Sequence, residues 1–173
     1  MTRLSVDIPV LTTERLILRE PRAADFEAAA TFGASDRASF VGGPQSRFQV
    51  WRGFTSGIGH WILKGFGMWV AEEKATGGVI GRIGLVEHEG WSEIELGWQV
   101  YDGFEGKGYA YEAAMAARNH AHCAMGMPPM ISHIHPDNIR SRRLAERMGA
   151  TVEREAELLG HPCLIYRHPQ VMA

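Results

Sequence analysis

The feature that most constrains the fold of this chain is a glycine-rich turn at residues 103–108. An apolar, strand-like run at 94–100 precedes the turn, and an alanine-rich stretch with helical periodicity follows it. Glycine allows positive φ and close approach of a ligand, and a helix start offers unpaired N–H groups at the positive end of its dipole. The arrangement therefore predicts a site for a phosphate-bearing cofactor. The alternative is a glycine-rich turn with no ligand.

Two common phosphate-binding motifs do not match this turn. A P-loop requires a glycine five residues before Gly106 and Ser or Thr after Lys107, but Tyr101 and Gly108 occupy those positions. A dinucleotide-binding fingerprint that starts at Gly106 requires Gly or Ala at its last position, where the chain has Tyr111. Both motifs are excluded, so the turn predicts another kind of phosphate site.

Composition limits the class of protein. A length of 173 residues suits one domain with its own core, so we expect a single domain over 1–173. The chain is 45% hydrophobic and 22% charged, and no stretch approaches the ~20 apolar residues of a membrane span. Asp7 and Pro9 interrupt the region where a signal peptide is apolar, which favours a cytoplasmic location. A net charge of −2 argues against a general nucleic-acid binder. Cys123 and Cys163 are interpreted as buried thiols.

Hydrophobic periodicity predicts an alternation of strands and helices. Lys74 to Gly78 reads as the turn of a hairpin, and Pro128 and Gly149 as helix stops. The expected strands are 15–20, 67–71, 79–85, 94–100, 130–135, 151–159 and 163–168, and the expected helices are 24–32, 46–63, 110–127 and 139–148. This order indicates an α+β fold with a mixed sheet.

Two groups of polar residues have positions that suit a functional site. Within the strand 94–100, alternation places Glu95 and Gln99 on a polar face, opposite the apolar side chains. Asn138 lies at the start of the last helix, and Ser141, one turn later, begins the stripe that faces the protein. The alternative for the second pair is a helix cap and a buried serine bonded to the backbone.

Taken together, these segments resemble the GCN5-related N-acetyltransferase (GNAT) superfamily, and within it the ribosomal-protein alanine N-acetyltransferase branch. The resemblance covers nearly the whole chain. It rests on LTTERLILR at 11–19, GVIGRIGL at 78–85, ELGW at 95–98, GKGYA at 106–110 with Glu112, and Asn138, Ser141 and MGA at 148–150. It implies a mixed central sheet with helices on both faces, acetyl-CoA as co-substrate and, at family level, a homodimer.

The resemblance assigns the glycine turn to the pyrophosphate of acetyl-CoA. The family's loop has Val, four residues, Gln or Arg, two residues, Gly, one residue, and Gly or Ala; Val100, Gly108 and Ala110 match it. Glu105 stands where Gln or Arg is usual. We expect its carboxylate to turn away from the phosphates, with Lys107 as a compensating charge.

Further cofactor contacts follow from the same resemblance. The backbone of Gly106, Lys107, Gly108, Tyr109 and Ala110 is expected to hold the pyrophosphate. Pantetheine is expected to pair like an extra strand with Gln99 and Val100, beside Asn138 and Ser141.

The family chemistry is direct attack of an amine on the thioester, which passes through an oxyanion and expels a thiolate. Glu95 is the predicted base, acting through water, and a solvated strand glutamate is the alternative. Ser141 is predicted to give a proton or a hydrogen bond to the leaving thiolate. Asn138 is predicted to bind the cofactor or to order a water molecule. The spacing of His133 and His135 is unlike that of zinc ligands, so we expect no metal.

These assignments predict an N-acetyltransferase whose acceptor is a primary amine, either a peptide N-terminus or a small molecule. The alternative is a non-catalytic acyl-CoA sensor or binding module on the same fold. We expect the acceptor wall to involve Trp51, Trp61 and the His161–Pro162 turn, although these aromatic side chains suit a core equally well. We expect neither a nucleic acid nor a membrane as partner.

Overall fold

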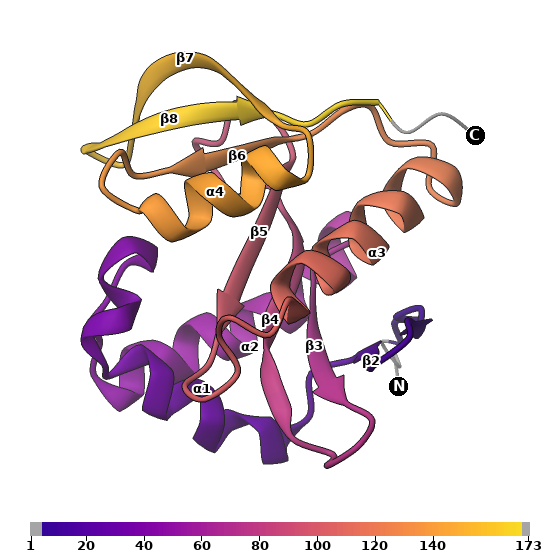
Figure 1. Ribbon diagram of the computed structural model, residues 1–173. Helices are drawn as coiled ribbons and strands as arrows, with labels where there is room; N and C mark the ends of the chain where they lie inside the picture. Colours follow the sequence, from indigo (N-terminus) through magenta and orange to yellow (C-terminus); the bar gives the residue numbers. More distant parts are fainter. Residues whose placement is uncertain (1–4, 171–173) are drawn as a thin grey trace.

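The computed structural model describes residues 5–170 as strands and helices that alternate along the chain (Figure 1). The strands are β1 (Leu11–Thr12), β2 (Leu16–Arg19), β3 (Met68–Glu73), β4 (Val79–Val86), β5 (Glu95–Val100), β6 (Ile131–Ile134), β7 (Thr151–Leu158) and β8 (His161–Arg167). The helices are η1 (Ala23–Asp25), α1 (Phe26–Gly33), η2 (Asp36–Val41), α2 (Arg47–Lys64), α3 (Tyr109–Cys123) and α4 (Ile139–Arg147), where η marks a 3₁₀ helix. Residues 1–4 and 171–173 of the expected domain 1–173 lie outside the described residues.

The strands form one eight-stranded sheet in the order β1-β2-β3-β4-β5-β6-β8-β7. Neighbours are antiparallel except β5 and β6, which are parallel. The expected α+β fold with a mixed sheet is confirmed. Each expected strand and helix is present, and β1, η1 and η2 are additional short elements.

Helix α3 ends earlier than the sequence predicts. Its last residue is Cys123, because Gly126 adopts a φ of 66° and the Met127 N–H bonds back to the Ala121 carbonyl. The helix thus stops before Pro128, where the sequence predicted its end.

The prediction of two buried thiols was wrong for Cys123, which is exposed, and Cys163 is buried. Cys123 lies two residues beyond Ala121, which is about 200° of helix rotation, and so its side chain faces away from the buried stripe.

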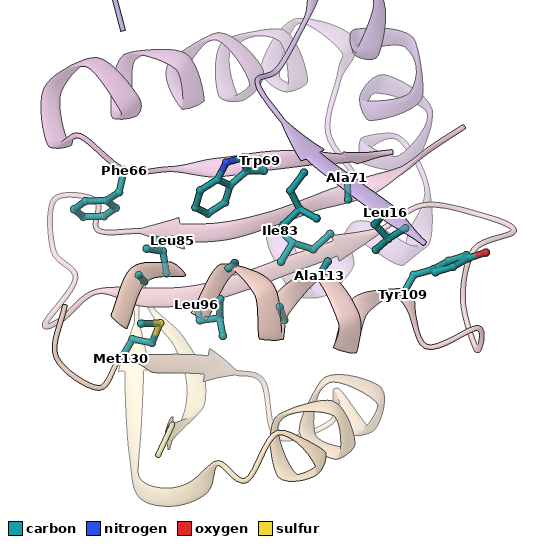
Figure 2. Close-up of a cluster of buried hydrophobic side chains, with 14 of the residues drawn as sticks. Leu16, Phe66, Trp69, Ala71, Ile83, Leu85, Leu96, Tyr109, Ala113 and Met130 are labelled. Carbon is teal, nitrogen blue, oxygen red and sulfur yellow. The ribbon is translucent and has the colours of Figure 1, made fainter. Parts of the chain in front are cut away.

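The main core lies between α3 and the sheet (Figure 2). Ala113, Ala114, Ala117 and Ala121 are fully buried, as their helical spacing predicts. Their small side chains let the helix approach β4 and β5 closely, where Leu85 and Leu96 are also fully buried. Figure 2 shows the strands lying between α3 on one side and the helices of the first half on the other, as expected.

A buried ion pair joins the first helical segment to the sheet. Arg19 on β2 donates to both carboxylate oxygens of Asp25 at 2.8 and 2.9 Å, and its Nε donates to Glu72 on β3 at 2.7 Å. Asp25 also accepts from the Arg22 N–H at 2.7 Å and immediately precedes α1. The pair therefore fixes where α1 starts relative to β2 and β3.

The parallel pair β5 and β6 determines where a ligand can enter. The two strands pair at Glu95 and Ile131. The Ser132 hydroxyl still reaches the Leu96 carbonyl at 2.6 Å. Beyond this point β5 pairs with β4 alone, through Gly97, Gln99 and Val100. The β6-facing edge of β5 is therefore open towards its carboxyl end.

Candidate active site

The glycine turn lies at the carboxyl end of β5. Gly103, Gly106 and Gly108 have φ values of 86°, 72° and 83°, in the left-handed region that favours glycine. Gly108 is the N-cap of α3 and provides no side-chain cap, so the first N–H groups of the helix keep their donor capacity. Within residues 5–170, the N–H groups of Gly106, Gly108 and Ala110 have no acceptor. The turn can thus present several backbone donors to an anion.

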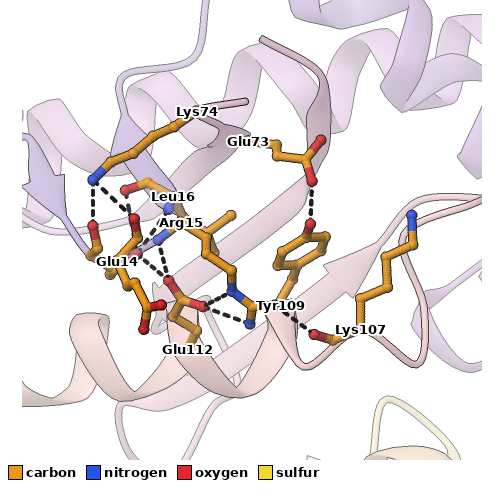
Figure 3. A network of polar contacts seen from close by, with 9 residues as sticks. Glu14, Arg15, Leu16, Glu73, Lys74, Lys107, Tyr109 and Glu112 are labelled. Atoms are coloured by element: carbon orange, nitrogen blue, oxygen red, sulfur yellow. Dashed lines mark hydrogen bonds and ion pairs between the residues drawn. The ribbon is translucent and has the colours of Figure 1, made fainter. Parts of the chain in front are cut away.

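A polar network fixes this turn to the sheet (Figure 3). Arg15 donates to Glu112 of α3 through Nε at 2.7 Å and to the Lys107 carbonyl at 2.9 Å. Tyr109 donates to Glu73 on β3, and Thr13 donates to Glu112 at 2.6 Å. Because the Lys107 carbonyl is engaged on this side, the backbone donors of the turn are oriented before any ligand arrives.

Glu105 forms an ion pair with Arg37 of η2. Arg37 also contacts Asp102 at 2.6 Å and donates to the Val100 carbonyl at 2.9 Å. The carboxylate is therefore directed at a guanidinium, and its charge is compensated by Arg37. The Lys107 ammonium instead lies 5.4 Å from the centre of the Phe104 ring. Arg37 could not be predicted from the sequence, because its partners are more than sixty residues away along the chain.

A cleft of about 600 Å³ opens where β5 and β6 separate. Its walls include Glu95, Gln99, His133, Ser141, His161 and Pro162. A chamber of about 250 Å³ lies beside it under α1 and α2, and His88 and Gln99 line both spaces. The cleft thus brings together three side chains that the sequence predicted from two separate segments, namely Glu95 and Gln99 on β5 and Ser141 on α4.

The two tryptophans predicted for the acceptor wall lie elsewhere. Trp61 is 1% exposed and belongs to the main core, where its ring packs edge-on against Trp69. Trp51 packs edge-on against Phe26 and lines neither space. The helical spacing of these aromatic side chains is clear in the sequence, but it does not show which face of α2 borders the chamber. The His161–Pro162 turn does line the cleft.

Glu95 is held in the cleft by two donors. Its Oε2 accepts from the Trp91 indole at 2.6 Å and lies 2.9 Å from His133 Nδ1. Among residues 5–170, its Oε1 has only a long contact of 3.4 Å, from the His133 N–H. The side chain of Glu95 is 13% exposed and that of His133 is 6% exposed. Oε1 is therefore the oxygen that retains capacity to accept a proton or a hydrogen bond.

Ser141 has a polarised arrangement that the sequence did not predict. Its Oγ accepts from the Trp98 indole N–H at 3.1 Å. An indole nitrogen only donates, so the Ser141 proton is free for another acceptor in the cleft. Asn138 caps α4, because its Oδ1 accepts from the Ser141 N–H at 3.2 Å. Asn138 thus positions Ser141, and its amide N–H₂ remains available to a ligand.

Burial shifts the pKa of two groups at or near the chamber. Burial lowers the pKa of His88, with a further lowering from nearby His60 and Arg82. Burial also raises the pKa of Tyr101 to about 12.

Within residues 5–170, no three His, Cys, Asp or Glu side chains are grouped as metal ligands. No helix in the same range has the length and apolar content needed to cross a membrane.

Comparison with known proteins agrees with this geometry. The family model described as an acetyltransferase (GNAT) domain matches residues 15–151. A crystal structure of the acetyltransferase from Agrobacterium tumefaciens str. C58 is 39% identical, with a TM-score of 0.89 over 98% of this chain and 99% of that one. RimL, a ribosomal L7/L12 α-N-protein acetyltransferase in complex with coenzyme A, has 16% identity and a TM-score of 0.77 over 94% of this chain and 98% of that one, which shows the fold alone.

A curated relative, the uncharacterized N-acetyltransferase YnaD of Bacillus subtilis (strain 168), is 27% identical over 80% of this chain and 81% of its own length. The uncharacterized protein YkkB of the same organism is 32% identical over 60% of this chain, and the match spans 62% of YkkB. The family match covers most of the chain, from β2 to the start of β7. The chain belongs to the GNAT family and is an N-acetyltransferase that uses acetyl-CoA.

Proposed function

We propose that the chain transfers the acetyl group of acetyl-CoA to a primary amine by direct attack on the thioester. The observation that carries this proposal is the cleft between β5 and β6, which has Glu95 and Ser141 in its walls. The glycine turn lies at the carboxyl end of the same strand, β5. Cofactor and acceptor can therefore approach the same open strand edge from two directions.

The proposed reaction proceeds in two steps. The neutral amine attacks the carbonyl carbon, a new C–N bond forms, and the carbonyl oxygen becomes an oxyanion. A water bound by Oε1 of Glu95 takes the excess proton of the amine and passes a proton on to the Glu95 carboxylate, which is the base. The C–S bond then breaks, and the thiolate of CoA accepts a hydrogen bond from Ser141, whose proton Trp98 leaves free.

The acceptor is a primary amine, either a peptide N-terminus or a small molecule. An α-amine has an ordinary pKa near 7.7–8.0, so roughly a tenth of it is neutral at pH 7, whereas under a thousandth of a lysine is. A modest base such as Glu95 suits an α-amine. RimL acts on a protein N-terminus, which makes peptide N-termini one arm of the acceptor screen.

The test is release of CoA from acetyl-CoA by purified protein, with amino acids, N-terminal peptides, polyamines and aminoglycosides as acceptors. Ser141→Ala is expected to lower kcat about tenfold or more, because one hydrogen bond to the departing thiolate is lost. The fold-change in the affinity for CoA should be smaller than the fold-change in kcat. Tight binding of acetyl-CoA without CoA release from any acceptor would favour a sensor over an enzyme.

A second variant tests whether the cleft is the acceptor site. A Cβ at Gly97 would meet one atom within 4 Å, Met68 Cε at 4.0 Å, so a side chain there fits the fold and enters the cleft. Gly97→Val is expected to lower kcat/KM about tenfold or more while thermal stability is kept. Gly97→Ala, the matched control, should have a smaller effect. Equal activity of Gly97→Val and wild type would place the acceptor elsewhere.

A further inference from the structure

Arg82 on β4 occupies a position that the proposed reaction does not use. It is the cross-strand partner of Gln99 on β5, so both side chains project from the same face of the sheet. This face is covered by α1 and α2, and Arg82 lines the 250 Å³ chamber beneath them. The chamber adjoins the cleft at Gln99 and His88, which line both.

The guanidinium of Arg82 has no partner among residues 5–170. It takes part in no hydrogen bond or ion pair there, and its Nε is buried without an acceptor. Its nearest described interaction is with the ring of Phe54, whose centre lies 5.6 Å from Cζ. The residue as a whole is partly buried. A cation that is partly withdrawn from water is costly without a partner, and proteins ordinarily pair such groups. The five N–H donors of Arg82 thus represent unused binding capacity.

No group of the chamber neutralises this cation. Among residues 5–170, no Asp or Glu lines its walls, and the other titratable side chains there are His60 and His88. His60 Nδ1 lies 2.6 Å from the Phe66 carbonyl, and Nε2 accepts from the Glu87 N–H at 3.0 Å. Neighbouring Tyr101 is neutral, because burial raises its pKa to about 12. The chamber therefore has a local positive charge in a chain of net charge −2.

Helix α2 leaves room for this guanidinium. A Cβ at Gly57 would lie 2.8 Å from an Nη atom of Arg82, so a larger residue there would displace it. Gly53, one turn earlier, also lines the chamber, and a Cβ there would meet nothing within 4 Å. Glycine in a helix costs about 1 kcal/mol relative to alanine. At Gly53 and Gly57 the chain therefore gives up some helix stability and keeps open space beside Arg82.

We propose that Arg82 binds a carboxylate of the acceptor, so that the acceptor is a small amino acid rather than a simple amine. This inference rests on the proposed acetyl transfer and names its substrate class. Planar guanidinium and carboxylate match as a bidentate pair. Cross-strand residues lie about 5 Å apart, so an amine near Gln99 and a carboxylate on Arg82 fit one small molecule.

Matched acceptor pairs test the proposal directly. Each amino acid is compared with its carboxamide, which has the same amine and no negative charge. We expect wild type to use the acids at higher kcat/KM, although the carboxylate makes the amine more basic and so less often neutral. Arg82→Gln should lower kcat/KM for the acids about tenfold to a hundredfold and leave that for the amides unchanged. Arg52→Gln on the exposed face of α2 is the control.

Two kinetic outcomes would overturn the proposal: equal use of acids and amides by wild type, or an equal loss for both acceptors in Arg82→Gln. Thermal unfolding gives a readout without turnover. Arg82→Met should unfold at the same temperature as wild type or higher, because an unpaired and partly buried cation has been removed. With CoA present, N-acetylated amino acids should stabilise wild type but not Arg82→Met.

The two measurements separate this inference from the proposed function. Carboxylate-dependent stabilisation without any CoA release would retain the role of Arg82 and reject acetyl transfer to amino acids. Turnover of amines without preference for a carboxylate would retain the transferase and reject the role of Arg82. A large fall in the unfolding temperature of Arg82→Met would show that Arg82 is a structural residue and would also reject the inference.

Discussion

Replacement of Glu95 by glutamine is expected to lower kcat for acetyl transfer about a hundredfold at neutral pH, within the usual range for loss of a general base. Glutamine keeps the size of the side chain and an oxygen for the Trp91 indole, which donates to Glu95 at 2.6 Å. It cannot accept a proton. The measurement is CoA release under saturating acetyl-CoA, with CoA affinity determined separately to show that the cofactor site is intact.

The pH dependence of this deficit distinguishes a base from a structural residue. An amine becomes neutral without assistance above its own pKa, which is near 7.7–8.0 for the α-amine of a peptide, so with such an acceptor the difference in kcat between Glu95→Gln and wild type should shrink at higher pH. Glu93→Gln is the control, because Glu93 pairs with Arg167 at 2.5 and 2.8 Å and lies outside the cleft. If Glu95→Gln retained more than half of the wild-type kcat, the base would have to lie elsewhere in the cleft.

The sequence predicted those parts of the fold that depend on local patterns. The strand that contains Glu95 and Gln99 was predicted from its alternation, and the start of α3 from the glycines before it. Both signals are local in the sequence. Side chains alternate between the faces of a strand with a period of two, and the turn before the helix needs residues that adopt positive φ. The end of α3 was misplaced, because the bond from Met127 to the Ala121 carbonyl stops the helix before Pro128 is reached.

Parts of the site that depend on pairing between distant segments could not be predicted from the sequence. Nothing near Arg37 shows that it compensates Glu105, and nothing near Arg82 shows that it has no partner. Trp98 was assigned to an apolar face, yet its indole N–H is the donor that orients Ser141. These roles arise only when β5, η2 and α4 come together, and a single sequence contains no signal of that proximity.

The largest expected effect on stability comes from Asp25. Asp25→Asn is expected to lower the free energy of unfolding by about 3–5 kcal/mol, because it leaves the buried guanidinium of Arg19 without its principal counterion. Arg19 and Asp25 are 6% and 4% exposed, so water cannot replace the lost contact. Denaturant unfolding at neutral pH measures the loss. Asp36→Asn, at an exposed position in η2, is the control and should change little.

The same pair makes an acid-dependent contribution to stability. Burial alone would raise the pKa of Asp25, but the hydrogen bonds from Arg19 and the Arg22 N–H outweigh it and lower that pKa below its ordinary value. The native state therefore binds the proton less readily than the unfolded chain does. The stabilisation is complete above the unfolded pKa, near 3.9, and is lost as the pH falls through the lower native value. The difference in the free energy of unfolding between wild type and Asp25→Asn should therefore become smaller as the pH falls over that range.

Asp25 also links stability to the acceptor site, since it immediately precedes α1, which contributes Ala29 and Phe32 to the chamber of Arg82. The glycine turn is fixed separately, through Arg15 and Glu112. Asp25→Asn should therefore raise the KM of the acceptor at temperatures well below unfolding, while CoA affinity stays near that of wild type. A parallel loss of CoA affinity would contradict this separation and show that the two anchors support the sheet as one unit.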